Sequence, residues 1–140
     1  MRNKWLPDDA LSGIPVIVVE ANRDDRAVLT ALLAMYGADV SAVRSPREAA
    51  AALRSSPAVV VCDPGASPED GLWLLRQADA CFVRDGRRRR VLALSESFAP
   101  RDSAQVLALG FDGFLAKPVD VQVLCAMVAD LARGGRPEVA

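Results

Sequence analysis

Short apolar runs rich in β-branched residues recur along the chain, and they constrain its fold more than any other feature. The clearest run covers residues 58–62, where every side chain is apolar and three of them are valines. A continuous apolar run of this length is typical of a strand that is covered on both faces in a parallel sheet. Further strands are predicted at residues 15–19, 39–43, 91–95 and 113–116.

Segments with helical signals separate these strands. The first begins at Asn22 or Asp24, either of which can cap a helix, and it stops at Gly37, a residue suited to the position after a helix end. The second begins at Ser45, which is followed by a proline at the first helical position and by Glu48, the glutamate of a capping box. The later helices are predicted over residues 46–54, 69–80, 101–109 and 121–133.

Strand and helix alternate about five times, which predicts an α/β fold of the (βα)5 type. Such a chain forms a doubly wound parallel sheet with right-handed crossovers and helices on both faces. A length of 140 residues leaves room for one domain. We expect this domain at residues 14–133, with residues 1–13 as an N-terminal extension and residues 134–140 as a C-terminal tail. The first dozen residues and the tail are expected to fray, although Trp5 and Leu6 are able to dock on the body.

The absence of histidine excludes several classes of chemistry. A chain without imidazole has no Ser-His or Cys-His nucleophile pair and no histidine-ligated zinc or haem. The three cysteines are far apart and odd in number, so we interpret them as reduced thiols and not as a disulfide framework. Acid, base and nucleophile roles therefore fall to carboxylates, lysine, serine or a thiol.

Charge and hydropathy argue against nucleic-acid and membrane partners. Lysine and arginine total 17 against 18 acidic residues, a formal net charge of −1, so the chain has no general basic field. No segment approaches the ~20 apolar residues of a membrane span or the apolar core of a signal peptide, which predicts a cytoplasmic protein. The run Arg87–Arg90 lacks interleaved aromatics and is interpreted as a solvated loop that is able to engage an acidic partner.

Four polar residues follow the predicted strands and define a candidate site. In an open α/β sheet, ligands bind beyond the carboxyl ends of the strands. The residues there are Glu20, Asp63, Ser95 and Lys117. Two acids, a hydroxyl and an ammonium suit the handling of a phosphoryl group, because the acid can attack while the hydroxyl and lysine offset charge on the transferred group. A divalent cation would ordinarily bridge carboxylate and phosphoryl oxygens.

The chain resembles the receiver domains of two-component response regulators over roughly residues 14–133. The motifs that carry the resemblance are VVEAN at 18–22, VVCD at 60–63 with DG at 70–71, ALS at 93–95 and GFDGFLAKP at 110–118. The resemblance implies a flavodoxin-like three-layer sandwich with strand order 2-1-3-4-5. It further implies a single-domain receiver in a bacterial two-component phosphorelay, a signalling protein and not an autonomous enzyme.

The resemblance also assigns roles to individual residues. Asp63 is the implied phosphoacceptor, Lys117 and Ser95 act with it, and Pro118 favours a cis turn after the lysine. Ser95 and Phe114 are the implied switch residues, which move when the aspartate is phosphorylated. The implied ligands of Mg2+ are Glu20, Asp63 and the backbone carbonyl of Gly65.

The implied partners are proteins. The phosphoryl donor is a histidine kinase or a phosphotransfer protein. The downstream protein partner is expected on the face formed by the fourth helix, the fifth strand and the fifth helix. The sequence leaves open whether the chain forms a homodimer. Direct binding to nucleic acid or to a membrane is not expected.

Several residues depart from the family pattern at the site. Ala21 replaces the acid that normally binds magnesium directly, which weakens the metal site. Glu96 stands where a small residue gives access to the aspartate, and Pro64 removes a backbone N–H next to Asp63. The loop proline is displaced from Ser67 to position 68. These changes keep open a second hypothesis, a degenerate receiver that acts as a phosphorylation-independent interaction or dimerisation module. A third, a flavodoxin-like binder of a small ligand, is disfavoured because no glycine-rich loop follows the first strand.

Overall fold

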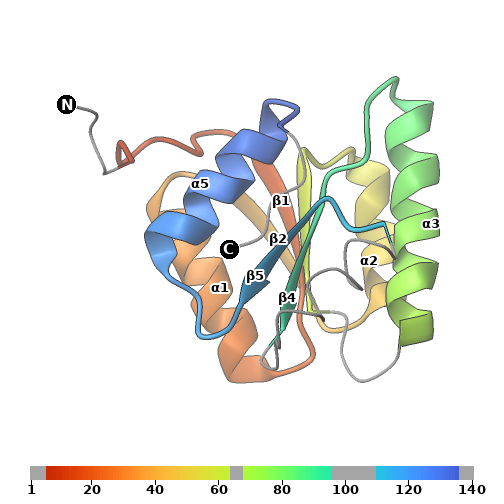
Figure 1. Ribbon diagram of the computed structural model, residues 1–140, viewed down its shortest axis with the longest axis horizontal. Coiled ribbons are helices and arrows are strands. Elements are labelled where there is room, and N and C mark those ends of the chain that lie inside the picture. Colours follow the sequence, from red (N-terminus) through yellow and green to blue (C-terminus); the bar gives the residue numbers. More distant parts are fainter. Residues whose placement is uncertain (1–5, 64–67, 96–109, 136–140) are drawn as a thin grey trace.

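The computed structural model describes residues 6–63, 68–95 and 110–135, which form a parallel sheet between two layers of helices (Figure 1). The strands are β1 (Pro15–Val19), β2 (Asp39–Val43), β3 (Val59–Cys62), β4 (Val91–Ser95) and β5 (Gly113–Ala116). The helices are α1 (Arg23–Met35), α2 (Pro46–Ala52) with the 3-10 turn η1 (Leu53–Ser55), α3 (Pro68–Arg84) and α5 (Val121–Ala132). The predicted helix over residues 101–109 lies outside the described residues.

All strand pairs are parallel, and the strands lie in the order β2-β1-β3-β4-β5. Figure 1 shows α1 and α5 on one face of the sheet and α2 and α3 on the other. The predicted fold class and strand order are confirmed.

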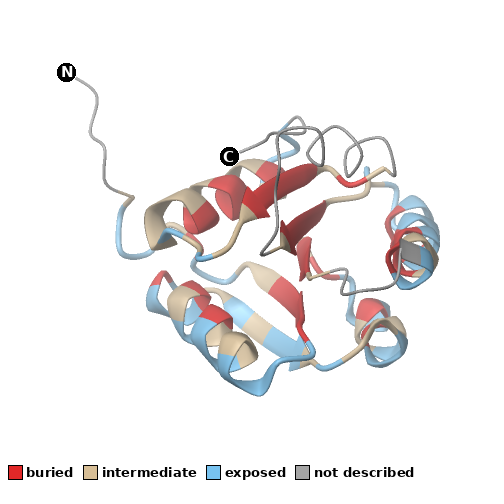
Figure 2. Ribbon diagram, turned by 60° about the horizontal axis from the view of Figure 1, so that its bottom comes forward, coloured by how far each residue is buried: buried red, intermediate tan, exposed pale blue. Residues whose placement is uncertain are grey.

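The apolar runs supply a separate core on each face of the sheet. Val16 and Val18 of β1 pack with α1 and α5, whereas Ile17 and Val19 pack with α2 and α3. β3 and β4 alternate in the same way, because successive side chains of a strand point to opposite faces. Figure 2 shows the central strands buried and the outer helix faces exposed. This two-sided burial explains why these strands contain almost no polar residues.

The second helix ends earlier than its sequence predicts. The prediction extends it to residue 54, but α2 stops at Ala52 and continues as the turn η1. Ser56 then adopts a left-handed φ of 58°, and its N–H donates to the carbonyl of Leu53. Pro57 follows, and a proline disfavours the helical conformation in the residue before it.

The third helix runs further than predicted. Its predicted end is residue 80, but α3 extends to Arg84 because its apolar stripe continues to Phe82, which is fully buried. Gly86, at a φ of 72°, lets the chain turn, and the N–H of Arg87 donates to the carbonyl of Phe82 at 2.8 Å. The other boundaries differ by one residue, since β3 begins at residue 59 and α5 ends at residue 132.

The expectation that the first dozen residues fray is wrong for their described part. Leu11 is fully buried, and its N–H donates to the carbonyl of Tyr36 at 2.8 Å. Leu6 packs against the α1–α5 core, and its N–H donates to Oε1 of Gln122 at 3.0 Å. Residues 6–13 are therefore part of the folded unit, whereas Trp5 lies outside the described residues.

The arginine run before β4 is more than a solvated loop. Arg88 is exposed as expected. The other three guanidinium groups contact distant residues: Arg87 lies over the ring of Phe82, Arg89 forms a salt bridge with Asp112, and Arg90 donates to the carbonyl of Ala132. These contacts fasten the loop to α3, to the start of β5 and to the end of α5.

The three cysteines, Cys62, Cys81 and Cys125, are buried and unbridged. Within residues 6–63, 68–95 and 110–135, no helix is long and apolar enough to cross a membrane.

Truncation of Leu11 tests the packing of the N-terminal segment. The substitution Leu11→Ala leaves a cavity beneath α1 and is expected to lower the free energy of unfolding by about 2–5 kcal/mol, measured by urea denaturation. The exposed Val83→Ala serves as the control and is expected to cost less than about 0.5 kcal/mol. Equal stability of the Leu11 variant and the natural protein would show that residues 6–13 contribute nothing to the fold.

Candidate functional site

The sheet brings the ends of four strands to one edge. Glu20 follows β1, Asp63 follows β3, Ser95 closes β4 and Lys117 follows β5. Backbone hydrogen bonds extend the sheet to this point, because the N–H of Asp63 donates to the carbonyl of Val19 and the N–H of Lys117 donates to that of Ser95. The residues predicted from the strand ends therefore lie at the carboxyl edge of the sheet.

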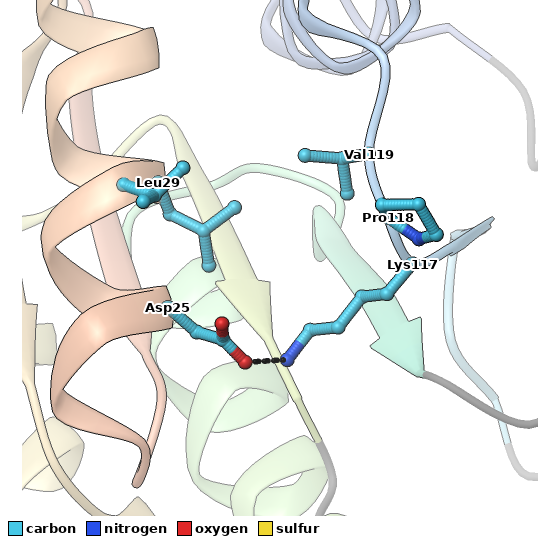
Figure 3. Close-up of a pocket in the computed structure, with 6 residues that line it drawn as sticks. Asp25, Leu29, Lys117, Pro118 and Val119 are labelled. Carbon is cyan, nitrogen blue, oxygen red and sulfur yellow. Dashed lines mark hydrogen bonds and ion pairs between the residues drawn. The ribbon is translucent and has the colours of Figure 1, made fainter.

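The Lys117 ammonium is the centre of the site. Its Nζ lies 2.8 Å from Oδ2 of Asp63 and 3.2 Å from Oδ2 of Asp25, and it also donates to Oε1 of Glu20. Figure 3 shows the lysine side chain reaching from the end of β5 toward Asp25 on α1. One ammonium thus joins three carboxylates that come from different parts of the chain.

Asp25 is the site residue that sequence reasoning missed. Only Asn22 and Asp24 were considered there, as helix caps, and the structure assigns the cap to Asn22, whose Oδ1 accepts from the N–H of Asp25 at 2.9 Å. This cap fixes the first turn of α1 so that Asp25 faces Lys117. The sequence places Asp25 in the first turn of α1, three residues after the capping Asn22.

The turn between β1 and α1 holds Glu20 in place. The N–H of Asn22 donates to Oε2 of Glu20 at 3.1 Å, and the guanidinium of Arg26 donates to the Glu20 carbonyl at 3.0 Å. Glu20 is only 3% exposed. A carboxylate this deeply buried depends on such partners, because the loss of its hydration is costly.

The carboxylates shift the pKa of Lys117. Burial alone would lower this pKa, because it disfavours the charged ammonium. The hydrogen bonds to the three carboxylates outweigh burial and raise the pKa of Lys117 above its ordinary value. The lysine is therefore a fixed cation at neutral pH and not a proton-transfer group.

The sequence itself matches the model of a known family. A family model for the response regulator receiver domain matches residues 16–129. The chain belongs to the response regulator receiver domain family. The resemblance read from the motifs is thereby confirmed at the level of the family.

Solved receiver domains share the fold. The signal receiver domain of a signal transduction histidine kinase from Syntrophus aciditrophicus is 28% identical, with a TM-score of 0.71 over 87% of this chain and 92% of that one. The receiver domain of a sensor histidine kinase from Pseudomonas aeruginosa, solved with a magnesium ion in its active-site cleft, is 25% identical, with a TM-score of 0.74 over 87% and 99%. The receiver domain of Ssk1 from Saccharomyces cerevisiae, solved with the phosphotransfer protein Ypd1, is 19% identical, with a TM-score of 0.74 over 88% and 91%.

The described residues of this receiver domain do not fit the magnesium site implied by the resemblance. Ala21 places an exposed methyl group where a carboxylate ligand is expected. Glu20 and Asp63 both bind the Lys117 ammonium, and the described part of the chain contains no group of three acidic, histidine or cysteine residues spaced to hold a metal. Four further residues that the sequence singled out lie outside the described residues: Pro64, Gly65, Ser67 and Glu96.

The two residues expected to act as switches lie on neighbouring strands. Ser95 is half-buried at the end of β4, next to Ala116 in the strand register. Phe114 is buried in β5, next to Ala93. The Lys117–Pro118 peptide bond is cis, as the resemblance implies. The switching roles themselves stay predictions.

Cys62 is adjacent to Asp63 but is unsuited to act as a nucleophile. Its thiol is fully buried at the end of β3. Burial raises the pKa of Cys62, and the negative charges of Asp63 and Glu20 raise it further. The thiol therefore stays protonated.

A pocket of about 500 Å³ borders the lysine (Figure 3). It lies between α1 and the segment that follows β5. Its lining residues are Asp25, Val28, Leu29, Lys117, Pro118 and Val119. The pocket thus combines an apolar wall with the charged pair that Asp25 and Lys117 form.

Lys117 gives the stability of the protein a defined pH dependence. A group whose pKa is raised by folding stabilises the fold fully below its unfolded pKa, here about 10.4, and loses this effect as the pH rises through the folded value. The free energy of unfolding should therefore fall above about pH 10.4, measured by urea denaturation across the alkaline range. In Lys117→Met this alkaline decrease in the free energy of unfolding should be absent. At neutral pH the variant should be about 3 kcal/mol less stable than the natural protein.

The other lysine of the chain, Lys4, provides the matched control. Lys4→Met should retain the alkaline loss of stability seen in the natural protein. The same alkaline profile in both variants would contradict the assignment of this effect to Lys117.

Proposed function

We propose that this receiver domain accepts a phosphoryl group on Asp63 and signals through protein–protein contacts. The observation that supports this most is the 2.8 Å contact between Nζ of Lys117 and Oδ2 of Asp63. In the transfer, a carboxylate oxygen of Asp63 forms the new P–O bond while the P–N bond of a phosphohistidine donor breaks, and the electron pair goes to the imidazole nitrogen. The ammonium then offsets negative charge on the phosphoryl oxygens.

The proposed donor is a histidine kinase or a phosphotransfer protein. Two similar receiver domains belong to histidine kinases, and a third shares the fold and is solved with a phosphotransfer protein. The pocket beside Lys117 offers such a donor an apolar surface next to the nucleophile. A relay of this kind operates in the cytoplasm, where we propose that the protein acts.

The proposed output uses Ser95 and Phe114 as switch residues. Both lie on the strands next to Lys117, so a change at the phosphorylated edge can reach them through the sheet. The downstream partner, or a second copy of the chain, would then bind the face that includes β5 and α5, together with residues 101–109.

A second candidate function is a phosphorylation-independent interaction module. The observation that favours it is the combination of Ala21 with a lysine that is bonded to three acids at this edge. An ammonium that neutralises the nucleophile and a metal site without its direct ligand both oppose phosphoryl transfer. The fold would then be retained for its surfaces alone.

Intact mass distinguishes the two candidates. After incubation with acetyl phosphate and Mg2+, the natural protein is expected to gain the mass of one phosphoryl group, because Asp63 and Lys117 form the required pair. Asp63→Asn is expected to gain none. A mass gain that persists in Asp63→Asn would place the acceptor elsewhere. No gain in the natural protein, with a gain in Ala21→Asp, would establish the second candidate.

Magnesium affinity provides an independent measurement. Ala21→Asp restores an oxygen ligand at the site and is expected to tighten Mg2+ binding about tenfold in titration calorimetry. The control Ala27→Asp introduces the same charge at an exposed position of α1. Equal effects of the two substitutions would mean that general charge, and not a ligand at position 21, governs the affinity.

A further inference from the structure

A groove of about 520 Å³ lies between α2 and α3, on the face of the sheet opposite to α1 and α5. Each of its two walls is a row of four residues on one helical segment, at positions i, i+3, i+4 and i+7. One wall comprises Arg47, Ala50, Ala51 and Arg54, and the other comprises Gln77, Ala80, Cys81 and Arg84. A stripe of this spacing runs about 10 Å along a helix, which gives the groove a length of about two turns.

The basic residues lie at the two ends of the groove. The guanidinium of Arg47 lies 5.0 Å from the ring centre of Trp73, near the start of α3. At the other end, Sγ of Cys81 donates to the carbonyl of Leu53, so Arg54 lies close to the final turn of α3 that carries Arg84. The two helices therefore run side by side in the same direction, with one arginine at one end and two at the other.

The middle of the groove is small and apolar. Ala50, Ala51 and Ala80 contribute only methyl groups, and beneath them Leu53 and Cys81 are buried. Small side chains allow another backbone to approach closely. An amphipathic helix laid in a groove uses contacts of this spacing.

The positive charge of the groove comes from its own arginines and not from the net charge of the chain. Its lining contains no carboxylate, although the chain as a whole has a formal net charge of −1. Arg84 has a salt bridge to Asp85, and Arg47 and Arg54 are exposed. A nucleic-acid strand would need exposed aromatic rings on which to stack, but the Trp73 ring is already covered by Arg47. The charge of the groove is thus complementary to an acidic protein segment.

We propose that the α2–α3 groove binds a helical segment of a partner protein that carries acidic side chains at both ends of a small apolar stripe. Acidic residues seven positions apart on such a helix are separated by about 10 Å, which matches the distance between the basic ends. The binding needs no phosphoryl group on Asp63, and it uses helices that do not contribute a carboxylate to the Lys117 cluster.

A designed peptide provides the probe. It is a helix of about 18 residues with glutamates at positions i and i+7 and alanine or leucine at i+3 and i+4, and a matched peptide carries glutamine in place of both glutamates. Titration calorimetry is expected to show saturable binding of the acidic peptide, and amide NMR shifts are expected on α2 and α3. Arg47→Gln with Arg54→Gln should weaken the binding about tenfold.

Control variants separate the groove from general electrostatics. Arg76→Gln with Arg88→Gln removes the same charge from exposed positions outside the groove and should change the affinity less than about twofold. Arg47→Lys with Arg54→Lys keeps the charge and should retain most of the binding, which separates loss of charge from a folding defect. Asp63→Asn should bind the peptide as the natural protein does, so that failure of phosphorylation does not affect this test.

Four outcomes would overturn the proposal. They are the absence of saturable binding, equal affinity for the glutamine peptide, equal weakening by the two double glutamine variants, and tighter binding of a single-stranded oligonucleotide to the same groove.

Discussion

The ion pairs of Lys117 are the interaction on which the carboxyl edge of the sheet depends. The lysine follows β5, and its ammonium reaches carboxylates that follow β1, begin α1 and follow β3. Without the ammonium, these three carboxylates would lie close together at a partly buried edge of the sheet, where their negative charges repel strongly. A single cation therefore determines whether three separate segments can meet. The cap at Asn22 and the bonds from Arg26 then fix the acids in the positions that the ammonium requires.

This arrangement has a cost for phosphoryl chemistry. In a receiver domain, the lysine is useful when it pairs with the aspartate and with the incoming phosphoryl oxygens. Here the same ammonium also neutralises Glu20 and Asp25, so transfer to Asp63 requires it to exchange part of this bonding for contacts to the new group. The side chain of Ala21 contains no oxygen that could bind a cation in place of the lysine. The competition between a fixed ammonium and a divalent cation for the same acids is thus the physical issue that separates an active receiver from a degenerate one.

The fold could be predicted from sequence further than the site could. The central strands β1, β3 and β4 are apolar on both faces, and all five strands could be predicted within one residue at each end. The packing of Leu11 was missed because a single buried leucine in a polar segment has no periodicity. Asp25 was missed because its direction depends on which residue caps α1, and Asn22 and Asp24 were equally suitable. The groove could not be predicted at all, since its walls become neighbours only after two crossovers have placed α2 beside α3.

The distribution of charge argues that the two surfaces act separately. The chain is almost neutral, yet four acids gather at the start of α1 and at the ends of β1 and β3, while the lining of the α2–α3 groove contains three arginines and no carboxylate. Screening confines each field to about 8–10 Å at physiological salt, so a partner at the groove responds chiefly to the arginines. α3 nevertheless belongs to the crossover that follows β3 and Asp63. A protein bound to α2 and α3 would therefore hold the helix that follows Asp63, while α1 and the pocket beside Lys117 stay accessible.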